Sequence, residues 1–293
     1  MLPDAFRNSD GEAPRFGRLL YFSFVTITTL GYGDVVPVHP AVQAVVSLES
    51  VLGVLYPSII VARVVALWAE GGSRPFAPPQ KDAGPRHYAF LSGLLAFTLV
   101  AQPWLQDAPF SGPAIGLLLV VQLLGVLYAC GGGKIVTRVG TALVVVALAG
   151  RLGPGPAEAV RTPIGLAAQV GFFLLATGTL VAWLARVEEV TREVVYAGIS
   201  AYFLLGFSLG EAFRLLERVQ PGSLEGGAEA LADGSGYAYF GFMTLTTTGF
   251  GDILPVTPAA ENLSTLGSLA GVFYPAILVA RLVTLYRSDD HAV

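Results

Sequence analysis

Charged residues and cysteine are both scarce in this chain of 293 residues. Only 13% of the residues are Asp, Glu, Lys or Arg, and Cys130 is the single cysteine. One cysteine excludes an intrachain disulfide framework and a cysteine-based metal site. The net charge of −4 is small and the basic residues form no cluster, so we expect no nucleic-acid partner.

Residue patterns typical of enzymes are also absent. The chain contains no Ser-His-Asp arrangement, no phosphate-binding loop and no cluster of metal ligands around its three histidines. We therefore expect neither enzyme activity nor a cofactor. The N-terminus lacks the basic region, apolar core and cleavage site of a signal peptide, so none is predicted.

Apolar residues, in contrast, make up 54% of the chain, and the mean hydropathy is +0.65. These values are typical of an integral membrane protein. A helix crosses the hydrocarbon core with roughly 20 apolar residues at about 1.5 Å each. Seven runs approach or exceed this length, at about 41–68, 88–105, 113–130, 135–150, 163–186, 194–216 and 259–286. The sequence therefore predicts an all-α polytopic membrane protein with about seven transmembrane helices.

An internal repeat relates the two ends of the chain. Residues 26–34 read TITTLGYGD, and residues 244–252, which lie 218 positions later, read TLTTTGFGD. More than half of residues 21–67 are identical to their counterparts without any gap. The same shift aligns three further pairs outside the motif, namely Tyr21 with Tyr239, Gly53 with Gly271, and Pro57 with Pro275.

Both copies of the motif resemble the selectivity filter of the potassium-channel superfamily, whose pattern is Thr-x-x-Thr-x-Gly-(Tyr or Phe)-Gly. The resemblance implies rings of backbone carbonyls, contributed by four loops, that replace the hydration shell of K⁺. Glycine suits such a loop because successive carbonyls face one side only if the backbone alternates between two conformations. The implied filter residues are Thr29, Leu30, Gly31, Tyr32 and Gly33, and then Thr247, Thr248, Gly249, Phe250 and Gly251. K⁺ at this filter is the only metal that we expect.

The resemblance also implies roles around each filter. Two re-entrant pore helices, from about 16 to 28 and ending near 247, precede the loops. Tyr32 and Phe250 are expected to pack outward against these pore helices. Asp34 and Asp252 are expected at the outer mouth, where negative charge attracts cations. The aromatic donors that hold these two carboxylates in the family correspond here to Tyr21 and Tyr239.

Two features of the predicted inner helices concern gating and conduction. Gly53, Pro57, Gly271 and Pro275 lie where a bend would serve gating, although glycine and proline are also common in membrane helices generally. Glu49 lies about two turns into the first inner helix. It is either a carboxylate that faces the cavity and attracts cations, or a hydrogen-bonded packing residue. A lower single-channel K⁺ current in Glu49→Gln would support the first alternative.

We divide the chain into four parts. Residues 1–69 form a first pore domain, residues 70–87 a cytoplasmic linker, residues 88–186 a four-helix bundle and residues 187–293 a second pore domain. The bundle occupies the place of a voltage sensor, but its fourth span carries no Lys or Arg between residues 163 and 185. Because a sensor must move charge through the membrane field, we expect little or no voltage sensitivity.

The predicted assembly is a homodimer in the cell membrane, because a filter needs four loops and this chain supplies two. The function that the resemblance implies is passive, K⁺-selective conduction, as in a bacterial channel with two pore loops. No outer helix precedes the first pore helix, so the alternative is a truncated, non-conducting subunit that needs a full-length partner. A potassium-uptake transporter and a non-selective cation channel are less consistent with two intact Gly-aromatic-Gly cores.

Overall fold

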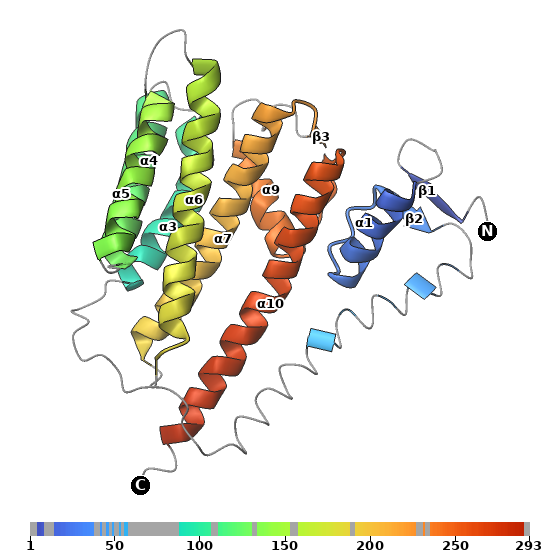
Figure 1. Ribbon diagram of the computed structural model, residues 1–293. Helices are drawn as coiled ribbons and strands as arrows, with labels where there is room; N and C mark the ends of the chain where they lie inside the picture. The colour runs from blue at the N-terminus through green and yellow to red at the C-terminus, as the bar shows by residue number, and fades with distance from the viewer. Residues whose placement is uncertain are drawn as a thin grey trace.

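The computed structural model describes residues 5–8, 15–37, 88–106, 111–130, 134–152, 158–187, 191–226 and 235–289, and the single positions 42, 45, 46, 49, 53, 56, 57 and 231. Within these residues the chain is an all-α polytopic membrane protein (Figure 1). The seven described positions from 42 to 57 are helical, and the rest of the predicted first inner helix lies outside the described residues.

Six helices in the described ranges contain 19 to 32 residues each. They are α3 (Tyr88–Gln106), α4 (Ser111–Cys130), α5 (Lys134–Leu152), α6 (Glu158–Leu184), α7 (Arg192–Val219) and α10 (Pro258–Asp289). Each agrees with a predicted apolar run to within five residues at either end. By length and composition, α6, α7 and α10 contain segments that can cross a membrane, at Thr162–Leu184, Arg192–Val219 and Pro258–Leu282.

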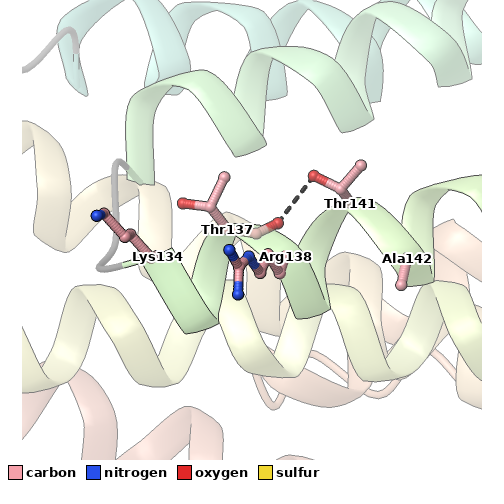
Figure 2. Close-up of a pocket in the computed structure, with 5 residues that line it drawn as sticks. All are labelled: Lys134, Thr137, Arg138, Thr141 and Ala142. Carbon is pink, nitrogen blue, oxygen red and sulfur yellow. Dashed lines mark hydrogen bonds between the residues drawn. The ribbon is translucent and has the colours of Figure 1, made fainter.

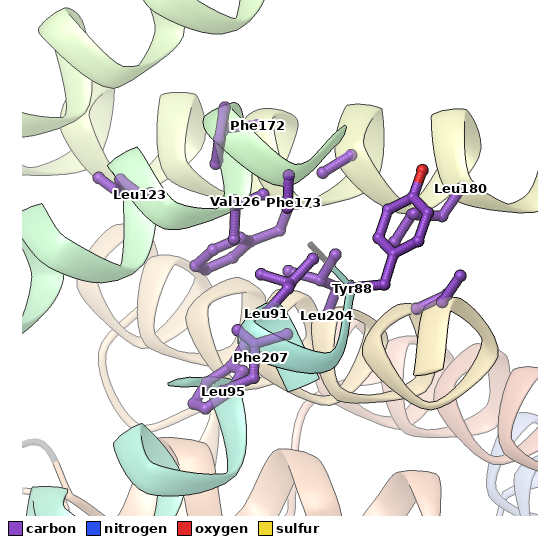
Figure 3. Close-up of a cluster of buried hydrophobic side chains, with 14 of the residues drawn as sticks. Tyr88, Leu91, Leu95, Leu123, Val126, Phe172, Phe173, Leu180, Leu204 and Phe207 are labelled. Carbon is purple, nitrogen blue, oxygen red and sulfur yellow. The ribbon is translucent and has the colours of Figure 1, made fainter. Parts of the chain in front are cut away.

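Helices α3 to α6 form a bundle that packs against α7 (Figure 1). Its core consists of large apolar side chains that are almost fully buried. Figure 3 shows Leu91 and Leu95 of α3 close to Phe173 of α6 and to Leu204 and Phe207 of α7. The bundle is thereby joined to the second pore domain through one face of α7.

Two short helices are each too short to cross the membrane. Helix α1 (Phe16–Ile27) has 12 residues and α9 (Ser235–Leu245) has 11. At about 1.5 Å per residue each reaches about 17 Å, roughly half of the hydrocarbon core. Their C-terminal ends, Ile27 and Leu245, are related by the 218-residue shift, and each is followed directly by one copy of the Thr-Gly motif.

A two-stranded antiparallel sheet brackets each short helix and its loop. Strand β1 (Phe6–Asn8) pairs with β2 (Val35–Pro37), and β3 (Leu224–Gly226) pairs with β4 (Ile253–Pro255). All four strands and both registers obey the 218-residue shift. We did not predict these strands, because three residues are too few to show an alternating pattern.

A second apolar core joins the two repeats. Tyr21, Val25, Leu30 and Tyr32 of the first repeat are buried together with residues of α7, α9 and α10. The first loop is therefore packed against the second pore domain of the same chain. In Figure 1, α1 lies beside α10.

Candidate functional site

The two short helices end in the same way. The Thr28 N–H donates to the Phe24 carbonyl at 3.0 Å, and the Thr28 hydroxyl donates to the same oxygen at 2.8 Å. In the second copy, Thr246 makes both bonds to Phe242, at 2.8 and 2.7 Å. The first threonine of each Thr-Thr pair thus caps its helix and starts the loop.

Each loop then alternates between two backbone conformations. The residues with left-handed φ are Thr29 (59°), Gly31 (56°) and Gly33 (77°), and their counterparts Thr247 (53°), Gly249 (53°) and Gly251 (77°). Thr29 and Thr247 are the only non-glycine residues with positive φ in the described part of the chain. This conformation costs a residue with a Cβ about 1 to 2 kcal/mol. Alternation of this kind turns successive carbonyls toward one side of the loop.

The loops of one chain lie side by side. A Cβ placed on Gly251 would lie 2.6 Å from the Tyr32 carbonyl oxygen, and one placed on Gly249 would overlap the Leu30 carbonyl oxygen. The second loop therefore needs glycine both for its left-handed backbone and because a Cβ would overlap the backbone of the first loop. A Cβ placed on Gly31 or Gly33 would meet nothing within 4 Å among the described residues.

The outward sides of the two loops differ strongly in burial. In the first loop Leu30, Tyr32 and Asp34 are 2%, 6% and 4% exposed. In the second loop Phe250 is 70% exposed, and its neighbours Thr246, Thr248 and Asp252 are exposed as well. The first loop is thus covered by the second repeat, whereas the described residues do not cover the second loop.

The side chain of Tyr32 packs against the second repeat. Its hydroxyl shares a hydrogen bond with the fully buried hydroxyl of Thr244 on α9, and the buried Ser264 of α10 lies next to it. Its ring stacks on Phe240, with 5.7 Å between the ring centroids. Tyr32 of the first loop therefore packs against α9, the short helix of the other repeat.

Asp34, the first of the two predicted outer-mouth carboxylates, has a partner that we did not predict. Arg18 of α1 donates to Asp34 at 3.0 Å and also contacts Glu261, in the first turn of α10, at 3.2 Å. Tyr21, the predicted donor, lies close enough to Asp34 for its hydroxyl to lower the pKa of that carboxyl, and its role as a support of the loop stays a prediction. A guanidinium has five N–H donors, so Arg18 can contact both carboxylates at once. Burial raises the pKa of the Asp34 carboxyl, and the charge of Arg18 opposes this rise.

The second outer-mouth carboxylate has the aromatic partner. The Tyr239 hydroxyl donates to Asp252 at 2.8 Å. The 218-residue shift places Gly236 at the position of Arg18 and Gln43 at the position of Glu261. The ion pairs of Arg18 with two carboxylates therefore have no counterpart at Asp252. Our sequence analysis missed Arg18 and Glu261, although a charge inside an apolar helix was a signal for both.

Glu49 makes a hydrogen bond to the pore helix. The Ser23 hydroxyl of α1 donates to the Glu49 carboxylate, which is half-buried. This contact is what the packing alternative requires, and the counterparts of both residues are glycines, Gly241 and Gly267. The role of Glu49 in conduction stays a prediction.

The two inner-helix glycines are sites of close approach. A Cβ on Gly53 would overlap the carbonyl oxygen of Ile27, and one on Gly271 would overlap that of Leu245. Each glycine thus allows a close approach to the last residue of a short helix, α1 or α9. Helix α10 continues through Gly271 and Pro275, and the proposed gating bend stays a prediction for all four positions.

A separate cavity of about 600 Å³ opens on α5. Figure 2 shows its lining residues, Lys134, Thr137, Arg138, Thr141 and Ala142, which all belong to this one helix. It contains no residue of either loop. Among the described residues, no group of three His, Cys, Asp or Glu side chains could hold a metal ion. The two loops are therefore the candidate site of this chain.

Comparison with known proteins identifies the family of the chain. A family model described as an ion channel matches residues 4–70 and 169–288, which include both loops, their short helices and both predicted inner helices. The matched residues amount to well over half of the chain. No curated protein and no solved structure matches the chain.

Proposed function

This chain belongs to the ion-channel family, and from that premise we propose that it conducts K⁺ selectively and passively across the cell membrane. The observation that carries the proposal is the alternating backbone of the two loops. Three left-handed residues recur at the same three positions in both copies. Carbonyls directed to one side of such a loop can replace the hydration shell of a K⁺ ion.

In each loop, equivalent residues have equivalent roles. The carbonyls of residues 29–33 and 247–251 line the path of the ion, and the hydroxyls of Thr29 and Thr247 add the innermost ring. Asp34 and Asp252 lie beyond the last glycine of each loop, where their charge raises the local cation concentration. No step of this mechanism uses a cofactor.

Four loops require two chains, and the unequal burial of the loops supports a homodimer. Within one chain, the first loop packs on the second repeat, and its carbonyls face the backbone of Gly249 and Gly251. A ring closes when the second loop packs in the same way on the first repeat of a partner. The open sides of Gly31 and Gly33 then face the partner's second loop.

The sequence around Phe250 fits this closure. Tyr32 contacts Phe240 and Thr244 and lies next to Ser264. The residues 218 positions earlier, which correspond to these three in the first repeat, are Phe22, Thr26 and Val46. Phe250 has no hydroxyl, and Val46 has none where the other site has Ser264. The ring of Phe250 is therefore expected to pack on Phe22 and Thr26 of the partner copy.

The bundle is proposed to anchor the pore without sensing voltage. Helix α6 carries no Lys or Arg from Thr162 to its end at Leu184. The core of the bundle is formed by apolar side chains such as Leu123 and Phe173. A voltage sensor needs several basic residues that move through the membrane field. Current that depends steeply on voltage would contradict this part of the proposal.

The test is ion flux through the purified full chain in liposomes. We expect K⁺ flux that exceeds Na⁺ flux and is blocked by barium. Gly249→Ala should abolish the flux, because a Cβ at this position overlaps the Leu30 carbonyl oxygen. Gly178→Ala is the matched control, since a Cβ there meets nothing within 4 Å among the described residues.

Equal K⁺ and Na⁺ flux would refute selectivity and leave a non-selective channel. Absent flux from folded protein would favour the non-conducting subunit. The mass of the complex tests the assembly independently of flux: a tetramer of chains would contradict the proposed homodimer.

A further inference from the structure

One face of α1 carries an apolar stripe that no other described residue covers. Phe16, Leu20, Phe24 and Ile27 are 82%, 51%, 37% and 37% exposed. Their spacing of three or four residues places them on the same side of the helix. The stripe extends over the 12 residues of α1, and the rise between its two ends is about 16 Å at about 1.5 Å per residue.

In the second repeat the corresponding face of α9 is covered by α7. A Cβ on Gly241 would lie 2.5 Å from the backbone nitrogen of Gly210, so the two backbones are nearly in contact. A Cβ on Gly210 would in turn lie 2.9 Å from the Cα atom of Ala238. Phe242 is 7% exposed and packs edge-on against Phe207 of α7, with the ring centroids 5.3 Å apart. Small residues allow this close approach of the two helices.

The first repeat has larger residues at these close-contact positions. Leu20 corresponds to Ala238, and Ser23 corresponds to Gly241. The Ser23 side chain is also held in place by its hydrogen bond to Glu49. A spanning helix that approached α1 as α7 approaches α9 would overlap both side chains.

A neighbouring position in the first inner helix has the same difference in exposure. Tyr274 of α10 donates to the Gly198 carbonyl of α7 at 2.8 Å and is half-buried. Its counterpart Tyr56 is 58% exposed. The uncovered region of the first repeat therefore includes residues of both its pore helix and its inner helix.

We propose that lipid acyl chains cover this α1 stripe (Phe16, Leu20, Phe24 and Ile27), in the position that α7 occupies in the second repeat. All four side chains are apolar, and the hydrocarbon of lipid tails solvates apolar side chains as well as another helix does. The length of the stripe, about 16 Å, matches one leaflet, which is half of a hydrocarbon core of about 30 Å. The inference rests on the membrane location of the chain and not on its ion selectivity.

The test compares two equivalent phenylalanines, Phe24 of the stripe and Phe242 under α7. Each is replaced by tryptophan in full-length protein whose Trp68, Trp104 and Trp183 are changed to phenylalanine. The protein is reconstituted into phosphatidylcholine vesicles with brominated acyl chains, which quench tryptophan on contact. We expect quenching several-fold stronger for Phe24→Trp than for Phe242→Trp.

Equal, weak quenching at the two positions would overturn the proposal, because it would mean that protein covers the stripe. Strong quenching of Phe24→Trp by aqueous iodide would also overturn it, because the stripe would then face water. If the tryptophan-depleted protein does not fold, a spin label on Leu20→Cys in the Cys130→Ala background gives the same answer. Oxygen should then relax the label several-fold more than a water-soluble nickel chelate does. Neither readout depends on K⁺ selectivity, so a failed flux assay leaves this test unaffected.

Discussion

Arg18 connects the end of the first loop to α10, and its removal is expected to destabilise the protein. Arg18→Met keeps an apolar stem but leaves the carboxylates of Asp34 and Glu261 without a cation. The side chains of these two residues are 4% and 7% exposed, so little water compensates them. Loss of one partner from a buried ion pair costs about 3 to 5 kcal/mol. Since Arg18 is 24% exposed, we expect the lower value, about 3 kcal/mol.

Thermal unfolding of the purified protein measures this loss. At about 2 to 4 °C per kcal/mol, Tm should fall by roughly 6 to 12 °C. Arg15→Gln, which removes an exposed charge one turn earlier, is the control and should leave Tm nearly unchanged. Adding Asp34→Asn and Glu261→Gln to Arg18→Met should restore most of the loss, because no uncompensated charge remains. A triple variant as unstable as Arg18→Met would show that packing, and not charge, is the cause.

Three further predictions concern single contacts. Gly271→Ala should lower the unfolding free energy by about 1 to 3 kcal/mol, because the added Cβ would overlap a backbone oxygen. The helical control Gly178→Ala should be neutral or slightly stabilising. Comparable Tm values for the two variants would contradict this prediction. Tyr32→Phe leaves the Thr244 hydroxyl buried without its partner and should cost about 1 to 3 kcal/mol, most of which Thr244→Val should recover in the double variant. The pKa of Asp34 is raised above its ordinary 3.8, so the folded state binds the proton more tightly than the unfolded state does. The stability that Asp34 contributes is therefore fully present below pH 3.8 and is lost as the pH rises through the raised pKa. The Tm of the wild type relative to Asp34→Asn should therefore fall as the pH rises above 3.8, and parallel pH profiles would exclude this linkage.

The two loops of one chain differ in burial, and the proposed homodimer accounts for the difference. Tyr32 and Phe250 occupy equivalent positions, but among the described residues Tyr32 is covered by the other repeat of its own chain and Phe250 is not. The exposure of Phe250 is therefore a property of the single chain, and we expect the partner copy to remove it. Variants at Phe250 should accordingly affect assembly more than the stability of an isolated chain.

The helices of this protein could be predicted from sequence because their signal is local. A run of about 20 apolar residues without charge is stable as a helix in a bilayer, whatever its neighbours are. The start of α1 at Phe16 and of α3 at Tyr88 agreed with the prediction to the residue. The positions of the two motif loops after their short helices also followed from sequence, because the Thr-Gly pattern recurs with one fixed shift.

Only the tertiary structure decided which residues hold these loops in place. Arg18 lies more than 200 residues from Glu261 along the chain, and no local pattern links them. Tyr32 and Thr244 are equally distant, and the contact of Gly271 with the last residue of α9 depends on how two helices cross. The local pattern of apolar residues determines which segments enter the membrane. Packing between distant segments determines which side chains pair. Such pairs depend on distances between atoms far apart in the chain, and no local pattern encodes these distances.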